Sequence, residues 1–136
     1  MENVNIELCE GQILVLKVEP EKKPELIAMD NNLEAMQAIV GGYIEMIMPF
    51  SDEVALVCNE DGKLEGLPLN RALCDEEDGS IQDIIAGTFF IALAPSDSDD
   101  FASLSPELAQ KYYDLFLHPE IFLRTPSGIV RLKAPF

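Results

Sequence analysis

Apolar side chains are concentrated in short runs that are separated by acidic and turn-forming residues. The run at 12–18 (QILVLKV) is dense in β-branched and aliphatic residues, which predicts a well-buried first strand. The runs at 43–48 and 54–58 predict two more strands. The most hydrophobic stretch, 84–93 (IIAGTFFIAL), predicts one central strand in which Gly87 marks a bulge or a close backbone approach.

Two segments carry the signals of helices. Asn31 and Glu34 have the spacing of a capping box, and the apolar positions up to Val40 share one helical face before a Gly-Gly pair ends the segment. A second helix is expected after the cap Ser105, because the Pro-Glu pair that follows suits a first turn. The side chains expected on its buried face are Leu108, Tyr112, Leu115 and Phe116.

The segments between these elements predict turns and loops. Residues 21–26 (EKKPEL) predict a turn or a short hairpin link before the first helix. The dipeptide Asp61-Gly62 is typical of a tight hairpin turn. Residues 66–74 (GLPLNRALC) follow no period and predict an ordered loop, and the segment after Pro119 predicts a terminal β-hairpin.

The predicted terminal hairpin separates apolar from basic side chains. Ile121 and Leu123 should share one face with the apolar side of the second strand, because alternate residues of a strand lie on the same face. Arg124, Arg131 and Lys133 should lie largely on the other face. The basic end of the chain is therefore expected to form a sheet edge or flap.

The elements together predict a single α+β domain. We expect a mainly antiparallel sheet of about five or six strands with two helices and a C-terminal β-hairpin, since hairpin signals outnumber helical crossovers. A chain of 136 residues can bury one hydrophobic core but not two. We place an acidic α+β domain at 1–118 and a hairpin extension of the same domain at 119–136.

The charge of the chain narrows the classes of partner. Twenty-five acidic side chains face nine basic ones, for a net charge of −16. Direct binding to nucleic acid is not expected, because such binding depends on Lys and Arg against phosphates, and anionic membranes are disfavoured for the same reason. Residues 30–100 hold sixteen acids and two bases, whereas 101–136 hold three acids and four bases. An acidic body with a mildly basic end suits a basic protein partner or a homodimer through the hairpin.

The sequence lacks the patterns of a membrane span, a leader peptide and a disulfide framework, and these features bear on the cellular compartment. No apolar run approaches the roughly 20 residues that span a bilayer, and the sequence begins without a leader pattern. The three cysteines, Cys9, Cys58 and Cys74, form no CxxC pair, which favours reduced thiols over disulfides or a zinc site. We therefore expect a cytoplasmic protein without membrane contact.

No catalytic motif is visible in the sequence. His118 is the only histidine, and its place at a helix end before Pro119 favours an interaction with the helix dipole. The acidic runs 75–78 and 97–100 lack the spacing of a calcium loop, so we predict no metal and no cofactor. A non-enzymatic role is favoured, and an enzymatic one stays open.

The candidate binding residues centre on Arg71, which is nearly alone among acids. One interpretation is structural: the arginine ties its loop to a carboxylate. The other is functional: Arg71 and Asn70 form a fork that holds an anion, a carboxylate or a base edge of a ligand, with Tyr43, Asn59 and Asp61 nearby. Both interpretations stay open at this point.

Three motifs carry a family resemblance. IVGGYIEMIMPF, VALVCNEDGKLEGLPLNRAL and DIIAGTFFIAL, in this order, resemble a domain-of-unknown-function family, number 3846, over about residues 12–117. The terminal hairpin departs from that family. The resemblance implies a small acidic protein encoded on a plasmid, a conjugative element or a phage.

These observations lead to two functional hypotheses. The first is a non-enzymatic interaction protein of a mobile genetic element, which binds a host or element-encoded protein in counter-defence or regulation; DNA mimicry is one form of it. The alternative is a small-ligand or nucleotide-binding module that uses the loop of Asn70 and Arg71.

Overall fold

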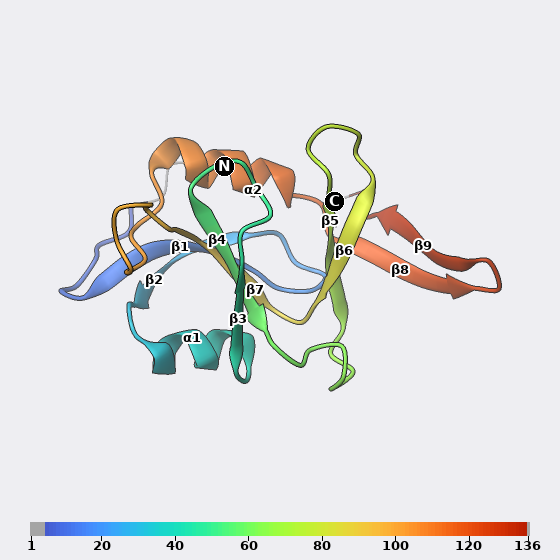
Figure 1. Cartoon of the computed structure of the whole chain (residues 1–136), viewed down its shortest axis with the longest axis horizontal. Helices are drawn as coiled ribbons and strands as arrows, with labels where there is room; N and C mark the ends of the chain where they lie inside the picture. Colours follow the sequence, from blue (N-terminus) through green and yellow to red (C-terminus); the bar gives the residue numbers. More distant parts are fainter. Residues whose placement is uncertain (1–4, 136) are drawn as a thin grey trace.

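The computed structural model describes residues 5–135, and in this range it contains two helices and nine strands. The main sheet has five antiparallel strands in the order β2-β1-β7-β4-β3 (Figure 1). They are β1 (Gln12–Val18), β2 (Glu25–Asp30), β3 (Ile44–Ile47), β4 (Val54–Asn59) and β7 (Phe89–Leu93). The other elements are α1 (Leu33–Val40), α2 (Pro106–Leu115), the hairpin of β5 (Leu69–Cys74) and β6 (Ile81–Ala86), and the hairpin of β8 (Glu120–Thr125) and β9 (Gly128–Lys133). The predicted α+β class with a C-terminal hairpin is confirmed.

The two helices cover opposite faces of the main sheet (Figure 1). On β4 and β7 the facing pair Leu56 and Ile91 packs toward α2, and the next pair, Val57 and Phe90, packs toward α1. All four side chains are fully buried. Strands buried on both faces need continuous apolar sequence, which is why these runs show no alternation.

Helix α1 begins one residue later than predicted. Its cap is Asn32, whose side-chain Oδ1 accepts a hydrogen bond from the backbone N–H of Ala35 at 2.8 Å, and Asn31 lies outside the helix. Glu34 is then the second helical residue, so the predicted capping box does not form. The predicted end is confirmed, because Gly41 has the left-handed φ of 78° that a helix C-cap favours.

Helix α2 begins as predicted, with Ser105 accepting a hydrogen bond from the N–H of Leu108 at 3.2 Å. Tyr112 and Phe116 are buried against the sheet, and Leu108 is partly buried. Leu115 does not belong to the buried face, because 54% of its surface is exposed. It instead lies at the rim of a cavity described below.

The stretch 84–93 is divided between two strands, so the prediction of one central strand is wrong. Gly87, with φ of 83°, turns the chain out of the β5–β6 hairpin and into the main sheet. A Cβ added at Gly87 would lie 2.8 Å from Leu67 Cδ1, so the predicted close approach is confirmed. Only tertiary packing distinguishes one long apolar strand from two joined by a turn.

Two segments that were predicted to be turns or loops contain strands in the structure. The turn expected at 21–26 ends early, and Glu25–Asp30 forms the edge strand β2, on which only Met29 is buried. The expected loop at 66–74 contains β5, where a β-bulge after Leu69 places two polar residues in succession in the interior. A strand with one buried position, or with buried polar residues, lacks the pattern by which strands are recognised.

The predicted hairpin turn at Asp61-Gly62 is wrong. Strand β4 pairs with β3 and β7 rather than with the strand that follows it, and residues 60–66 form consecutive turns. Gly62 does not have a positive φ. A Cβ at this position would lie 2.7 Å from the carbonyl oxygen of Ala86, so glycine is required here by close packing.

The C-terminal hairpin has the predicted arrangement of faces. Ile121 lies opposite Leu132 and Leu123 lies opposite Val130, so these four share one face. The basic residues alternate with them and lie on the other face. Within the described residues, neither helix is long and apolar enough to cross a membrane.

Candidate functional site

The predicted binding residues Asn70 and Arg71 are both fully buried. Nε and Nη2 of Arg71 donate to the carbonyl oxygen of Phe116 at 3.1 and 3.0 Å, and Nη2 also donates to the carbonyl oxygen of Lys22 at 2.6 Å. Nη1 donates to Asn70 Oδ1 at 2.8 Å. The guanidinium thus joins β5 to the C-terminal end of α2 and to the link between β1 and β2.

The partners of Arg71 are carbonyl groups, rather than the carboxylate that the structural interpretation expected. Burial lowers the pKa of the Arg71 guanidinium, and the charge of Glu120 opposes that change. The carbonyl end of α2 is the negative end of its dipole, which favours a cation there. Asn70 in turn donates to the carbonyls of Val18 and Gly87, both at 2.9 Å.

The other predicted binding residues lie elsewhere. Tyr43 is 71% exposed at the start of β3. Asn59 is buried, where it donates to the carbonyl of Val40 at 3.2 Å and accepts from the N–H of Asp61 at 2.8 Å. Asn59 and Asp61 line a small hollow of about 190 Å³ that does not include Asn70. The five predicted residues therefore do not form one site.

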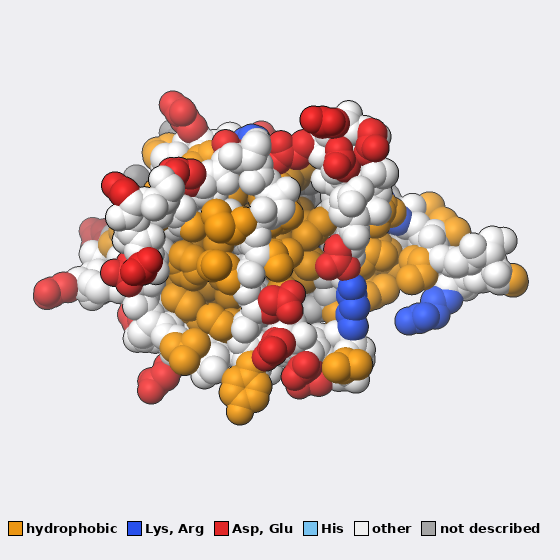
Figure 2. Space-filling model, viewed as in Figure 1, with side chains coloured by type: hydrophobic (Ala, Val, Ile, Leu, Met, Phe, Trp, Pro, Cys, Tyr) orange, Lys and Arg blue, Asp and Glu red, His pale blue; other side chains and the backbone are white. Residues whose placement is uncertain are grey.

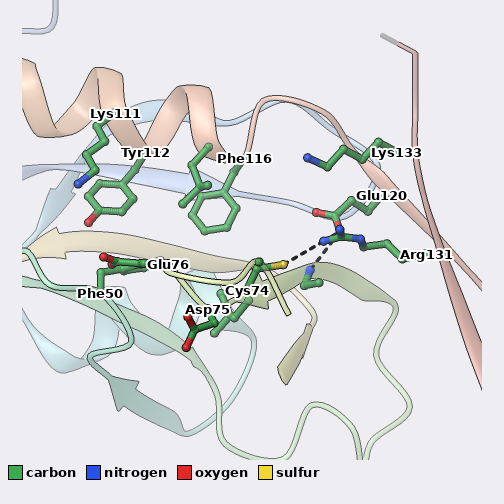
Figure 3. A pocket seen from close by; sticks show the side chains of 14 residues that line it. Phe50, Cys74, Asp75, Glu76, Lys111, Tyr112, Phe116, Glu120, Arg131 and Lys133 are labelled. Atoms are coloured by element: carbon green, nitrogen blue, oxygen red, sulfur yellow. Dashed lines mark hydrogen bonds and ion pairs between the residues drawn. The ribbon is translucent and has the colours of Figure 1, made fainter. Parts of the chain in front are cut away.

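A larger cavity, of about 540 Å³, lies between α2, β5, the acidic turn at 75–80 and the base of the β8–β9 hairpin (Figure 3). Phe50, Tyr112 and Phe116 form one wall of it. The ring centroid of Phe50 lies 4.8 Å from that of Tyr112 and 6.3 Å from that of Phe116. Tyr112 and Phe116 are almost fully buried, so the partly buried ring of Phe50 is the part of this wall that a flat apolar group can contact.

The aromatic wall is held in place by a polar contact at its edge. The Tyr112 hydroxyl donates to Asp52 Oδ2 at 2.7 Å, and Lys111 Nζ lies 2.6 Å from the same oxygen. Burial, and then the hydrogen bond to Asp52, raises the pKa of the Tyr112 hydroxyl. Lys111, and then Tyr112, lowers the pKa of Asp52. Tyr112 therefore stays a neutral donor with a fixed ring.

The acidic residues around the cavity already have partners. Asp75 Oδ1 accepts two backbone N–H groups of its own turn, at 2.8 and 3.1 Å. Glu76 accepts the N–H and the hydroxyl of Ser51 at 2.9 and 3.0 Å. Glu120 accepts the N–H of Ala72 at 3.3 Å. These carboxylates maintain the shape of the site.

Three of the nine basic residues of the chain also line this cavity. Lys111 is paired with Asp52, as described above. Arg131 Nη1 lies 3.5 Å from Glu120 Oε1 and donates to Cys74 Sγ at 3.2 Å. Lys133, by contrast, has no ion pair or side-chain hydrogen bond with any residue in the described range. In Figure 3 its side chain extends toward Phe116.

A family model described as a domain of unknown function (DUF3846) matches residues 13–117. The chain belongs to this family. Neither a curated protein nor a solved structure matches the chain. The cavity combines two parts of the sequence: the DUF3846 region provides the aromatic wall, while Glu120, Arg131 and Lys133 come from the hairpin beyond the matched range.

The cavity of this DUF3846 protein contains a single thiol among its lining residues. Cys74 Sγ accepts a hydrogen bond from Arg131 Nη1, and the carboxylates that line the same cavity are Asp75, Glu76 and Glu120. Within residues 5–135 no three His, Cys, Asp or Glu side chains are grouped so that they could hold a metal ion. The site offers the exposed ammonium of Lys133, which has no ion pair among the residues that the structure describes, beside the wall formed by Phe50, Tyr112 and Phe116.

Sequence reasoning missed this site because its residues are distant in sequence. Tyr112 and Phe116 were expected to be core residues, and Arg131 and Lys133 were expected to be on an outer face. One signal was available: Glu120, Arg131 and Lys133 share the charged face of the predicted hairpin. In the structure this charged face points toward the rest of the protein, and the sequence pattern did not reveal that orientation.

Proposed function

We propose that this chain is a non-enzymatic binding protein whose cavity takes a small ligand with an anionic group and a planar apolar part. The observation that carries the proposal is the ammonium of Lys133, which has no ion pair or hydrogen bond with another side chain among residues 5–135 and extends toward the aromatic wall. The cavity volume of about 540 Å³ is within the range of roughly 300–1,000 Å³ found for ligand sites. The acids at the rim are occupied by protein donors, so they compete little for Lys133.

The anionic group of the ligand is a carboxylate or a phosphate, since both suit a lysine ammonium and a nearby guanidinium. The planar part would lie against the partly buried ring of Phe50, which packs on the buried ring of Tyr112. This proposal moves the small-ligand hypothesis away from the loop of Asn70 and Arg71. In it, Arg71 contributes indirectly, because its hydrogen bonds fix the helix end that carries Phe116.

The test is a calorimetric and thermal-shift comparison of matched probes. We expect adenosine monophosphate or naphthoate to bind and raise the melting temperature, while adenosine and naphthalenemethanol do so at least about tenfold more weakly. Comparison of the first two probes distinguishes phosphate from carboxylate. Lys133→Ala should weaken binding by about tenfold, because one charge-assisted contact is lost.

Lys23→Ala is the matched control, because it removes the same charge from an exposed position outside the cavity lining. We expect this variant to bind like the wild type. If neither anionic probe binds in preference to its neutral analogue, the ligand proposal is wrong. If both lysine variants weaken binding equally, the effect is one of overall charge and the site is not the cavity.

Cys74 provides a second readout of cavity occupancy. Its thiol lines the cavity, whereas Cys9 is exposed elsewhere. A bound probe should slow the reaction of Cys74 with a maleimide severalfold and leave the rate at Cys9 unchanged. Mass spectrometry of the labelled peptides measures both rates in one sample. Equal protection of the two thiols would contradict binding in the cavity.

A second candidate function is binding of a basic protein, as expected of a mobile-element interaction protein. Figure 2 supports it: hydrophobic side chains gather over the middle of this face, and acidic side chains surround them. Tyr43, Met46 and Met48 are exposed on or beside the edge strand β3. An apolar centre with a polar rim is the usual composition of a protein interface.

The interaction candidate is tested by capture from a host lysate, with Met46→Glu and Met48→Glu as one double variant. A partner that binds this surface should be retained at low salt and lost from the double variant. Leu8→Glu is the control, because Leu8 is 44% exposed and lines neither of the hollows that include residues of β3. A partner retained equally by all three proteins would contradict this use of the surface.

A further inference from the structure

The β8–β9 hairpin is turned so that its apolar face points away from the protein. Ile121, Leu123, Val130 and Leu132, here called the outer face, share one side of the hairpin and are 42–48% exposed. This face carries no charged side chain in the paired region. A hairpin at the surface of a monomer normally has the opposite polarity, with apolar residues inward and polar residues in water.

The charged face of the hairpin is directed toward the rest of the chain. Arg131 and Lys133 line the cavity described above. Arg124 and Ile129 line a further hollow together with Leu67 and residues of β6. The orientation is set by contacts at the base, where Glu120 accepts the backbone N–H of Ala72 on β5. The outer face is therefore exposed because of how the hairpin attaches, and not because the hairpin is loosely placed.

We propose that the outer face packs against the outer face of a second copy of this chain. Two identical apolar faces related by a two-fold axis are self-complementary, which is the usual form of a homodimer contact. Packing would also stabilise the hairpin, since an isolated two-stranded hairpin is marginally stable in water. The occupant is a second copy rather than a basic partner, because the face has no acidic side chain to attract one.

The distribution of charge disfavours contact between the acidic regions of two chains. Residues 119–136 contain one acid, Glu120, and three bases, Arg124, Arg131 and Lys133, for a net charge of +2. Residues 1–118 therefore carry a net charge of −18, which gives −16 for the whole chain. Contact between residues 1–118 of two copies would bring strongly acidic regions together, whereas the outer face itself carries no charged side chain.

The projection of the hairpin also keeps the acidic bodies apart. Figure 1 shows the hairpin extending from one end of the molecule. Its strands have six residues each, which corresponds to roughly 20 Å at about 3.4 Å per residue. The Debye length is only about 8 Å at physiological ionic strength. The repulsion between the acidic bodies of two copies joined through their hairpins is therefore weakened, and the part that remains falls further as salt is added.

The size of the outer face limits the strength of the dimer. Four half-exposed side chains cover much less than the roughly 800 Å² per partner of a standard stable interface. We therefore expect a weak dimer that forms at concentrations on the order of 100 µM. Added salt should strengthen it, because salt screens the repulsion between acidic bodies and does not weaken apolar contacts.

Sedimentation velocity between about 10 and 500 µM tests the proposal, at about 0.15 M and about 0.5 M salt. The average mass should rise from 15.1 kDa toward twice that value, with the rise at lower concentration in high salt. The double variant Leu123→Glu with Val130→Glu should remain monomeric, while Leu64→Glu should behave as the wild type. Circular dichroism establishes that the variants are folded.

A crosslinking experiment locates the contact independently of affinity. In a Cys9→Ser background, Leu123→Cys should form a disulfide-linked dimer at least about tenfold faster than Leu64→Cys, because the two-fold contact holds the paired thiols together. Equal rates would overturn the proposal. So would a wild-type chain that stays monomeric at every concentration, or a dimer that survives the outer-face double variant.

Discussion

Replacing Arg71 with alanine is expected to lower the free energy of unfolding by about 3 kcal/mol. The substitution leaves the carbonyls of Lys22 and Phe116 and the side chain of Asn70 without their buried donor. Each buried acceptor left unpaired costs about 1–3 kcal/mol, and partial relaxation keeps the total below the sum. Urea unfolding followed by circular dichroism measures the change, since the chain has no tryptophan.

Two further variants make the Arg71 result specific. Arg124→Ala removes an exposed arginine and should change stability by less than about 0.5 kcal/mol. Arg71→Lys keeps the positive charge, but an ammonium cannot reproduce the planar set of hydrogen bonds that the guanidinium donates. We expect it to lower the free energy of unfolding by less than Arg71→Ala does. If Arg71→Ala unfolds at the same urea concentration as the wild type, the buried hydrogen bonds are not what Arg71 contributes. A stable variant that lost anionic probes would instead support a direct role in binding.

The second large effect is expected at Cys58, whose thiol should react about a hundredfold more slowly at pH 8 than an unperturbed cysteine. Burial, and then the charges of Glu45 and Asp83, raises the pKa of this thiol from its ordinary value of 9.0 to about 11. The thiolate fraction at pH 8 falls by the same two orders of magnitude. Labelling with iodoacetamide, followed by peptide mass spectrometry, measures the rate.

Cys9 is the internal control, because it is exposed in the same molecule. In urea above the unfolding transition, Cys58 should react at a rate close to that of Cys9. A native Cys58 that reacts as fast as Cys9 would show that the thiol is accessible and ionises normally. That result would contradict the packing of Cys58 beneath α2 and the β5–β6 hairpin.

The raised pKa of Cys58 also predicts a dependence of stability on pH. A group whose pKa is higher in the folded chain contributes fully below its unfolded pKa, so this contribution is present below pH 9 and is lost as the pH rises toward 11. The two-unit difference corresponds to about 3 kcal/mol. Cys58→Ala should therefore lose less stability than the wild type between about pH 9 and 11. Parallel stability curves for the two proteins would contradict this.

Most secondary-structure elements could be predicted from the sequence because they carry their own local signals. Both helix ends with strong capping residues, Gly41 and Ser105, were placed correctly. The strands β1, β3 and β4 were predicted because their apolar residues are dense and bounded by turn-forming residues. The predictions for β2 and β5 failed for the opposite reason: one is an edge strand with a single buried side chain, and the other has buried polar residues.

The candidate site could not be predicted because it depends on how the elements pack. Its aromatic wall comes from Phe50 and the C-terminal part of α2, its thiol from β5, and the ammonium of Lys133 from the last strand. Asn70 and Arg71 were predicted to bind a ligand because an arginine among acidic residues is typical of a site for an anionic group. In the fold these two side chains are buried and donate to the backbone carbonyls of Val18, Lys22, Gly87 and Phe116.

The sequence by itself determined the α+β class, the terminal hairpin and the separation of its apolar and basic faces, because these depend on periodicity and turn residues over a few positions. Only the tertiary structure decided which face of the β8–β9 hairpin packs toward the rest of the protein. That choice depends on the contacts of Glu120 and Arg131 with β5, which lies about 50 residues earlier in the chain. Long-range contacts of this kind leave no periodic signal, and they place Lys133 in the cavity and Leu123 in solvent.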